Sequence, residues 1–511
     1  MTDWTAGYVA DIGYTYGYYT ELNALRIKLP FLAAGLVCPE IGAACELGFG
    51  QGMSVGIHAA ATLTQWSGTD FNPSQAGFAQ ELARVSGADA RLFDQAFDEF
   101  CARSDMPDFD FIALHGIWSW ISDENRHIIV DFLRRKLKVG GVLYISYNTQ
   151  PGWAAMVPMR ELLNQHTEVM GVDGQGIVNR IDSALDFAQR LLDTKPLYGK
   201  VNPQVGARVK KMTTENRNYL AHEYFNRDWD PMSFASMAEW LAPAKLGYAC
   251  SAHLTDHVDA VNLTAEQQAF LKEIPDAMFR ETVRDFMSNA QFRRDYWVKG
   301  ARQLGSIERE ELLRAQRVIL VTARDAVELK TSGTLGEATL NEGIYAPILD
   351  LLADHKPRTL GQIEASVKAK GVSFSQVLQA VMILAGKGSL AFAQDDALAA
   401  KARRSTDKLN LHLMSKCRSS NDFAYLASPV TGGGVNVSRV QQLFLLARNQ
   451  GKKQPQEWAQ FVWQHLQAMN QRLTKEGQAL ESAEENLAEL TRQAAEFAEK
   501  RLPVLEALKI A

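Results

Sequence analysis

The chain has 511 residues, of which 46% are hydrophobic and 22% charged, and its formal net charge is -5. This length exceeds what a single hydrophobic core supports, so two to four domains are expected. The slightly acidic balance excludes the broad basic field that is typical of nucleic-acid-binding proteins.

Five cysteines are scattered along the chain without a CxxC pair. This distribution argues against a disulfide framework or a zinc site and favours a reducing compartment. The N-terminal residues show no basic segment followed by an apolar one, so no signal peptide is expected. No apolar run approaches the roughly 20 residues that a membrane span needs. The sequence therefore predicts a cytoplasmic protein without a membrane span.

Residues 1–165 alternate short apolar runs with longer amphipathic ones, which predicts an α/β domain of Rossmann-like type. A parallel sheet covered by helices on both faces is the arrangement that this alternation favours. Helices are expected at 73–87 and 123–138 among others. Strands are expected at 44–48, 65–70, 90–94, 109–116 and 140–148.

The remaining chain predicts four further units. Residues 166–212 form a helical connector, and residues 213–300 form an α+β or mainly helical domain. Residues 301–400 combine a strand with two helices and a hairpin, which is similar to a winged helix. Because this unit lacks a dense Lys/Arg surface, a protein-interaction role is favoured over DNA binding. Residues 401–511 are expected to be mostly helical.

Two features of the last unit are of interest. Glycines at 427–438 predict a break between helices. The tail at 473–508 carries apolar residues at the a and d spacing of a coiled coil. The pattern covers under three heptads, so a helix docked on its own protein is favoured over an intermolecular coiled coil.

The stretch CELGFGQGMS at 45–54 places Gly48, Gly50 and Gly52 directly after Glu46. Glycine permits unusual backbone angles and removes the side chain, so a ligand can approach the loop. A dinucleotide-binding loop has its third glycine three residues after the second, where this chain has Met53. The pattern E-x-G-x-G-x-G is similar instead to the first motif of class I S-adenosylmethionine (SAM) methyltransferases.

In that class an acid at the end of the second strand accepts the ribose hydroxyls, and a polar residue ends the third strand beside the adenine. Asp70, followed by Phe71, lies 18 residues after Gly52. Asp94, followed by Gln95, ends the predicted third strand. These four residues, with Glu46 and the three loop glycines, are the expected cofactor contacts.

The loops after the fourth and fifth predicted strands face the reacting centre in an open α/β sheet. His115 is either a base or a polar group satisfied at a strand end, and the second reading is favoured. Trp118 is expected to pack against the adenine or the sulfonium, whereas Trp120 belongs to the core. Asn148 is expected at the mouth of the site, with an ordinary loop as the alternative.

Five tyrosines lie within twelve N-terminal residues, in YVADIGYTYGYY at 8–19. Aromatic faces attract cations, and both SAM and a lysine substrate carry positive charge. Tyr14 and Tyr16 are therefore candidate catalytic residues that position and desolvate an amine. The alternative is a hydrophobic cap. HEYFN at 222–226 begins like the zinc-protease signature but has Asn226 in place of the second histidine, so no metal site is expected.

The chain resembles a family that joins a class I SAM domain to a methyltransferase regulatory domain. The resemblance is carried by YVADIGYTYGYYTEL, CELGFGQG, ALHGIWSWIS, SYNTQPGW, YLAHEYFN, AKLGYACSAHL, LTAEQQAFL and FRRDYWVKG, and more weakly by ASPVTGGGVNVSRVQQLF. Well-known members are bacterial protein-lysine methyltransferases that act on rickettsial outer-membrane proteins. The resemblance implies SAM as cofactor, a large cleft for a protein substrate, and homodimers. One departure is Gly13, where such proteins usually have proline.

The leading hypothesis is methyl transfer from SAM to lysine ε-amines of a protein substrate. An outer-membrane or surface protein is the expected kind of substrate. One alternative keeps the chemistry with a small molecule, glycan or lipid as acceptor. Another is a SAM-binding regulatory protein without turnover. No nucleic-acid partner and no metal are expected.

Overall fold

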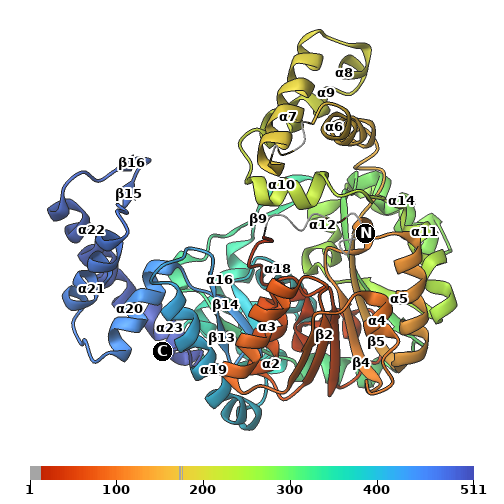
Figure 1. The fold of residues 1–511 in the computed structure, drawn as a ribbon. Coiled ribbons are helices and arrows are strands. Elements are labelled where there is room, and N and C mark those ends of the chain that lie inside the picture. The colour runs from red at the N-terminus through yellow and green to blue at the C-terminus, as the bar shows by residue number, and fades with distance from the viewer. Residues whose placement is uncertain (1–7, 9–12, 172–173, 175) are drawn as a thin grey trace.

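The computed structural model describes residue 8, residues 13–171, residue 174 and residues 176–511, and a mixed sheet forms its centre (Figure 1). Seven strands lie in the order β3-β2-β1-β4-β5-β7-β6. β1 to β5 are parallel, whereas β7 is antiparallel to both β5 and β6. The predicted α/β class is confirmed. The strands are β1 (Ala43–Leu47), β2 (Gln65–Thr69), β3 (Ala90–Phe93), β4 (Phe109–Leu114), β5 (Leu137–Asn148), β6 (Leu246–Ser251) and β7 (Phe292–Lys299).

Helices cover both faces of the sheet because successive strand residues point to opposite faces. Ala44 belongs to the apolar core shared with α1, α2 and α3, whereas Cys45 belongs to the core shared with α5 and α11. All five residues of β1 are buried, as expected for a central parallel strand. The covering helices are α1 (Ala24–Ala33), α2 (Met53–Ala61), α3 (Pro73–Ser86), α4 (Phe97–Cys101), α5 (Asp123–Lys136) and α11 (Phe234–Leu241).

The sheet corrects the predicted boundary at residue 165. β6 and β7 come from 246–299, a segment expected to form a separate domain, and seven residue pairs join β7 to β5. The alternation of strands and helices stops after β5, so the sequence pattern gave no indication that the chain returns to the sheet with β6 and β7. The segment between β7 and β6 contains α12 (Asp259–Asn262), α13 (Ala265–Glu273) and α14 (Ala277–Ser288).

A helical insert separates β5 from β6 and lies beyond one end of the sheet, at the top of Figure 1. It has its own apolar core, to which Met159, Leu163, Ile181 and Val209 contribute. One of its helices, α8, is short and spans Leu197–Val201. The insert consists of α6 (Val157–Val169), α7 (Ile177–Asp193), α8 (Leu197–Val201), α9 (Pro203–Met212) and α10 (Arg217–Tyr224).

The third unit begins after β7 and has a three-stranded sheet, β11-β8-β12, with helices packed against it. Its first strand, β8, precedes the helices α16, α17 and α18, and the other two strands pair with it on either side. A small hairpin, β9–β10, is attached. The elements are α15 (Ser306–Ala315), β8 (Arg317–Leu320), β9 (Lys330–Gly333), β10 (Gly336–Thr339), α16 (Glu342–Leu352), β11 (Arg358–Thr359), α17 (Leu360–Val367), α18 (Phe374–Gly386) and β12 (Leu390–Phe392).

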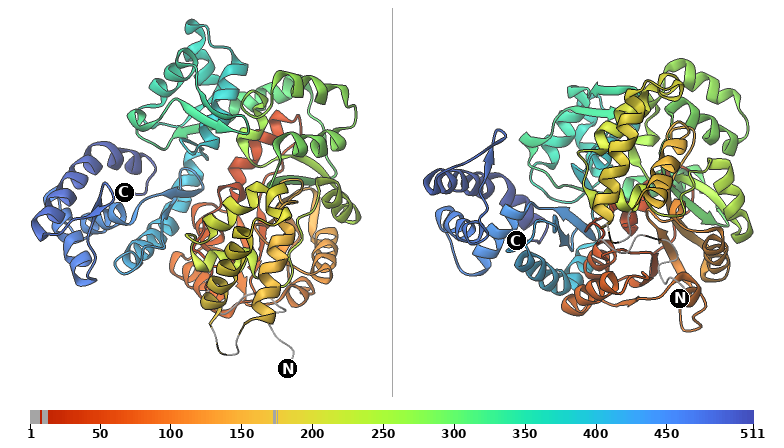
Figure 2. Two further views of the ribbon diagram at one scale, coloured as in Figure 1. Left: turned by 90° about the horizontal axis from the view of Figure 1, so that it is seen from above. Right: turned by 45° about the horizontal axis from the view of Figure 1, so that its top comes forward.

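The C-terminal unit packs onto α2 of the first unit (Figures 1 and 2). Met53 and Ile57 of α2 share one apolar core with Leu409 and Leu413 of α19. The glycine-rich segment predicted as a break forms the hairpin β13–β14. The elements are α19 (Asp396–Lys416), β13 (Tyr425–Ser428), β14 (Gly433–Asn436), α20 (Arg439–Asn449), α21 (Pro455–Ala468), β15 (Thr474–Lys475), β16 (Gln478–Ala479), α22 (Ala483–Glu496) and α23 (Leu502–Ala507).

The C-terminal tail docks on its own chain, as favoured from its pattern. Leu490, Ala494 and Phe497 of the tail are buried in the core that also holds Met53. A turn of π-helix, Phe497–Arg501, joins α22 to α23. Among the described residues, no helix combines the length and the apolar character that crossing a membrane requires.

The shared core yields a stability prediction. Leu409→Ala removes a fully buried side chain between α19 and α2, so the free energy of unfolding should fall by about 2–5 kcal/mol. Leu411→Ala is the matched control because Leu411 is 48% exposed on the same helix, and its effect should stay below about 0.5 kcal/mol. Urea unfolding followed by fluorescence measures both. Equal effects would contradict the described docking of α19.

Candidate methyltransferase site

The glycine loop connects β1 to α2 in a conformation that other residues rarely adopt. Gly48, Gly50 and Gly52 have φ angles of +71°, +56° and +72°. A Cβ on Gly48 would lie 2.2 Å from Cδ1 of Ile117, and one on Gly52 would lie 2.3 Å from Cβ of Ala79. The two outer positions are therefore restricted to glycine by both backbone angle and packing.

The carboxylate of Asp70 holds the middle of this loop. Its Oδ2 accepts a hydrogen bond from the Gly50 N–H at 2.8 Å, and its Oδ1 accepts one from the Asn72 N–H at 3.0 Å. Asp70 follows β2 and is 8% exposed. Burial raises the pKa of Asp70 to about 6, although both backbone hydrogen bonds favour the ionised form. The carboxylate therefore fixes the loop and still has acceptor capacity for a ligand.

Glu46 supplies the strongest indication of an absent cationic group. Its side chain is buried in β1, and its Oε2 has no hydrogen-bond partner among the described residues. Burial, together with the charge of Asp70, raises the pKa of Glu46 well above its ordinary value. A buried carboxyl oxygen without a partner is costly, so an ammonium group is the partner that it fits. The Glu46 carboxyl fits the ammonium at the amino-acid end of SAM, although Glu46 is not among the residues that line the cavity beside the glycine loop.

A cavity of about 390 Å³ lies beside the loop, at the ends of β1, β2 and β4. Gly48 and Gly50 form one wall, and Phe71 lies beside them. Aromatic rings and carboxyl groups contribute a large share of the rest of the lining, beside amide, hydroxyl and aliphatic side chains. The aromatic and acidic lining residues include Tyr8, Tyr14, Tyr19, Phe49, Phe97, Trp120, Asp98, Glu124 and Asp228.

Beyond β3, the structure separates the two residues that the sequence paired. Gln95 lines the cavity, and its Oε1 accepts a hydrogen bond from Arg103 at 3.3 Å. Asp94 is exposed and does not line the cavity. Adjacent residues that continue a strand point to opposite sides, which accounts for the separation. Gln95 and Asp98 therefore stand where Asp94 was expected.

The five N-terminal tyrosines divide into two groups. Tyr8, Tyr14 and Tyr19 line the cavity, and the Tyr14 and Tyr19 hydroxyls are hydrogen-bonded to each other. Burial raises the pKa of Tyr19 to about 12 and that of Tyr14 well above its ordinary value. These tyrosines are neutral at pH 7 and present rings and hydroxyls to the cavity.

The other two tyrosines contact the C-terminal unit, which corrects the prediction for Tyr16. Its ring lies 5.2 Å from that of Phe78 and 5.0 Å from that of Phe423. Tyr18 lies 5.0 Å from the ring of Tyr425. Tyr14 and Tyr16 are two residues apart, so alternation along a regular strand would place them on the same side; the structure separates them instead, and one segment serves both the cavity and the domain contact. Tyr16 does not line the cavity beside the glycine loop.

His115 follows β4 and lines the cavity, and neighbouring tyrosine side chains contact its ring. Its Nδ1 lies 2.7 Å from the Tyr144 hydroxyl, and its ring stacks on Tyr19 at 3.5 Å between centroids. Burial lowers the pKa of His115 to about 4. The imidazole is neutral at pH 7 and is a weak base, which agrees with the favoured reading of a satisfied polar group.

The two tryptophans after β4 exchange their expected positions: Trp118 lies in the core, and Trp120 lines the cavity. Trp118 is 0% exposed, and its Nε1 donates to Sδ of Met232 at 3.2 Å. It packs in the core below the cavity and does not line it. Trp120 lines the cavity instead. Both lie in one 3-10 turn, Trp118–Trp120, whose geometry the sequence pattern did not reveal.

Asn148 is close to the site but does not line the cavity. Its backbone N–H donates to Oγ of Ser119 at 2.9 Å, and its side chain is 3% exposed. Its Nδ2 has no partner among the described residues. The predicted contact with a substrate therefore has no direct support in this geometry.

Sequence reasoning missed Glu223, which lies in the rejected HEYFN segment. Its carboxylate interacts electrostatically with Tyr8, Tyr14 and Tyr19 of the cavity. Burial raises the pKa of Glu223 to about 7. The Glu223 backbone carbonyl accepts a hydrogen bond from Trp120 Nε1 at 3.3 Å. No signal in the sequence links this helix, α10, to the N-terminal tyrosines, because the two segments are far apart in the sequence and approach each other only in the folded chain.

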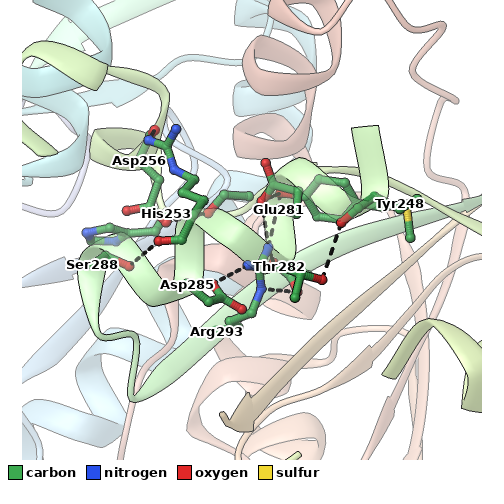
Figure 3. A network of polar contacts seen from close by, with 12 residues as sticks. Tyr248, His253, Asp256, Glu281, Thr282, Asp285, Ser288 and Arg293 are labelled. Carbon is green, nitrogen blue, oxygen red and sulfur yellow. Dashed lines mark hydrogen bonds and ion pairs between the residues drawn. The ribbon is translucent and has the colours of Figure 1, made fainter. Parts of the chain in front are cut away.

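A second polar cluster fastens α14 to the sheet (Figure 3). Arg293 of β7 bonds to Asp285 at 2.6 Å and to Glu281 and Asp295 at 2.9 Å. Three carboxyl groups surround one guanidinium, and burial raises the pKa of Asp285 to about 7. The Tyr147 hydroxyl donates to Asp295 at 2.9 Å, which continues the network into β5. The cluster stabilises the antiparallel edge of the sheet.

Comparisons with known proteins agree with the geometry. The family described as "Predicted methyltransferase regulatory domain" matches residues 216–299. The uncharacterized protein sll1526 of Synechocystis sp. is 41% identical over 99% of each chain. The uncharacterized protein RP789 of Rickettsia prowazekii is 26% identical over 54% of this chain and 49% of its own. PKMT2 from Rickettsia typhi in complex with AdoHcy has a TM-score of 0.68 at 16% identity and covers 94% of this chain and 98% of its own.

The strand order, the glycine loop and the cavity beside it match the fold of class I SAM-dependent methyltransferases. The chain belongs to the family of sll1526, and within it residues 216–299 match the family model described as a predicted methyltransferase regulatory domain. In this structure that domain contributes α10, α11 and the two last strands of the sheet.

The hydrogen bond between Asp70 and the loop yields the first site prediction. Asp70→Ala should weaken the binding of S-adenosylhomocysteine at least tenfold, because the Gly50 N–H loses its partner and the ligand loses an acceptor. Asp94→Ala is the control and should change the dissociation constant less than twofold, since Asp94 lies outside the lining. Isothermal titration calorimetry measures both. A larger effect at Asp94 would contradict the described site.

The raised pKa of Asp70 predicts a pH dependence of cofactor binding. With a pKa of about 6, the ionised fraction falls about fourfold between pH 7.5 and pH 5.5. Affinity for S-adenosylhomocysteine should therefore weaken by a similar factor as the pH falls. Asp70→Asn should remove this part of the dependence. An affinity of the wild-type protein that rises toward pH 5.5 would contradict the assigned role.

Proposed function

We propose that the protein transfers the methyl group of SAM to the ε-amine of lysine side chains in a protein substrate. The observation that carries the proposal is the lining of the cavity, in which three tyrosines and four carboxyl groups line the same space beside the glycine loop. Such a lining suits a cationic acceptor, because aromatic faces and carboxylates both attract an ammonium.

The charge of the cavity favours an amine over an anionic acceptor. Asp70, Asp98, Glu124 and Asp228 contribute carboxyl groups to the lining, whereas Arg227 is its one cation among the described residues. Arg227 is itself paired with Asp228 at 3.0 Å. The excess of carboxyl groups also raises the local concentration of cations at the mouth of the site.

The chemistry requires the amine to lose a proton before it attacks, since a free lysine has a pKa near ~10.4. SAM supplies an electrophilic methyl group on a sulfonium sulfur; the N–CH₃ bond forms as the S–CH₃ bond breaks. The rings of Tyr14 and Tyr19 desolvate the ammonium and so favour its neutral form. Glu223, which lies near these tyrosines with a pKa of about 7, is the proposed acceptor for the released proton.

The large area around the site supports a macromolecular acceptor. The helical insert has its own core. The third and fourth units together hold more than half of the residues that follow residue 165. A small acceptor would need little of this surface.

The direct test incubates the purified full-length protein with methyl-labelled SAM and with envelope and cytosolic protein fractions of its host. Mass spectrometry then locates the label. Label on lysines of one or a few proteins is the expected result. Release of S-adenosylhomocysteine without label in any protein would contradict the proposed acceptor and point to a small molecule, glycan or lipid. Cofactor binding without turnover would indicate a regulatory protein.

The division of the tyrosines predicts contrasting variants. Tyr14→Phe removes the hydroxyl hydrogen-bonded to Tyr19 in the cavity, and kcat should fall about tenfold or more. Tyr16→Phe leaves the ring that packs on Phe78 and Phe423, and kcat should stay within about twofold of wild type. Steady-state rates with the labelled substrate measure both. A loss confined to Tyr16→Phe would contradict the assignment.

A further inference from the structure

A second large cavity, of about 840 Å³, lies where three parts of the chain meet. Its walls come from α1, from the end of α18 in the third unit, and from the C-terminal unit, where α20 begins and the π-turn follows α22. It shares no lining residue with the cavity beside the glycine loop. The function proposed above does not use it.

Arg26 of α1 is a buried cation on the wall of this cavity and forms no ion pair within 4 Å among the described residues; the Glu21 carboxylate, which acts on it electrostatically, is itself bonded to Arg294 at 2.7 Å. Arg26 is 6% exposed, and its Nη1 donates to the Ala385 carbonyl at 3.3 Å. Its Nε has no partner among the described residues. A buried guanidinium in this state carries a desolvation cost that a single neutral carbonyl does not offset.

Two further cations on the wall are bonded only to carbonyl oxygens. Arg501 donates to Val321 O at 2.6 Å and to Asn436 O at 2.7 Å, and burial lowers its pKa. Lys387 donates to Glu328 O at 2.8 Å, and burial lowers its pKa as well. Neutral carbonyls satisfy the hydrogen bonds of Arg501 but leave its charge without an ion pair among the described residues, whereas Lys387 is exposed and lies near Glu328.

The acidic groups near the cavity do not balance these charges. Glu496 is the one carboxylate among the described residues that line it, and it is bonded to Arg492 at 3.0 Å. Lys500, also on the wall, is neutralised by Asp325 at 2.7 Å. Arg26 and Arg501 therefore give the cavity positive charge that no ion pair among the described residues neutralises, and Lys387 adds an exposed cation at the rim.

Neutral hydrogen-bond donors and the start of helix α20 also favour an anionic ligand. Ser438, Val440 and Gln441, from the first turn of α20, line the cavity, and the N-terminal end of a helix carries a partial positive charge. Arg501 lies in the π-turn Phe497–Arg501, and such turns occur frequently at functional sites. The cavity combines guanidinium groups, a helix N-terminus and side-chain amides, which are the donors that carboxylates and phosphates prefer.

We propose that this interdomain cavity binds a compact anion that carries at least two carboxylate or phosphate charges. Arg26 and Arg501 bind its charged groups, and Lys387 lies at the rim. The ligand would touch all three units at once, because its partners come from α1, α18 and the turn after α22.

The position of the cavity connects the anion to the glycine-loop helix. Tyr18 lines the cavity, and its ring lies 5.2 Å from that of His58 in α2. Asn23, also on the wall, donates from Nδ2 to the Thr431 carbonyl at 3.0 Å. An anion that orders these contacts also orders the segment that carries Tyr14 and Tyr19 into the cofactor cavity.

The test titrates the full-length protein with citrate and, separately, with inorganic pyrophosphate, at constant ionic strength set with sodium chloride. Isothermal titration calorimetry measures the stoichiometry and the dissociation constant. One molecule of at least one probe should bind per chain. Preference for citrate assigns a carboxylate ligand, and preference for pyrophosphate assigns a phosphate ligand.

Three variants complete the test. Arg26→Gln should weaken binding at least tenfold, and Lys387→Gln, at the exposed rim, should weaken it at least threefold even if the first variant folds poorly. Lys401→Gln, an exposed residue of α19 outside the cavity, should leave the affinity unchanged. Absence of binding by both probes would overturn the proposal. So would equal affinities for wild type and Lys387→Gln.

Discussion

The arrangement of the catalytic half depends on how the glycine loop passes between β1 and α2. The chain must turn within five residues while it passes Ile117 on one side and Ala79 on the other. Left-handed backbone angles and the absence of Cβ atoms at Gly48 and Gly52 make this passage sterically possible. The Asp70 carboxylate then holds the middle of the loop from the next strand. The position of the cavity follows from this one turn.

Because α2 begins directly after the loop, whatever packs on α2 also holds the loop. All nine residues of α2 are buried. Val55 and Ala59 face the sheet core, whereas Met53 and Ile57 face the C-terminal unit. This double burial explains why the helix is built from small and apolar residues. The N-terminal tyrosine segment makes a parallel connection, with Tyr14 in the cavity and Tyr16 on the C-terminal unit. The C-terminal unit is therefore part of the support of the site.

Local sequence signals were sufficient for much of this structure. The five parallel strands, the loop glycines and Asp70 followed from periodicity and spacing, because they depend on residues close together in the chain. The return of β6 and β7 to the sheet could not be predicted, since antiparallel pairing across more than a hundred residues has no local signature. The exchange between Trp118 and Trp120 and the role of Tyr16 depend on side-chain direction, which spacing alone did not determine. Glu223 was missed because α10 reaches the tyrosines only in the folded chain.

The most direct test of the central claim is a crystal structure of the full-length protein with S-adenosylhomocysteine. The account predicts that the ribose hydroxyls lie against Asp70, that the ammonium lies against Glu46, and that Gln95 is closer to the adenine than Asp94. A nucleoside bound outside the cavity beside the glycine loop would contradict the account. So would a complex in which Glu46 remains without a partner.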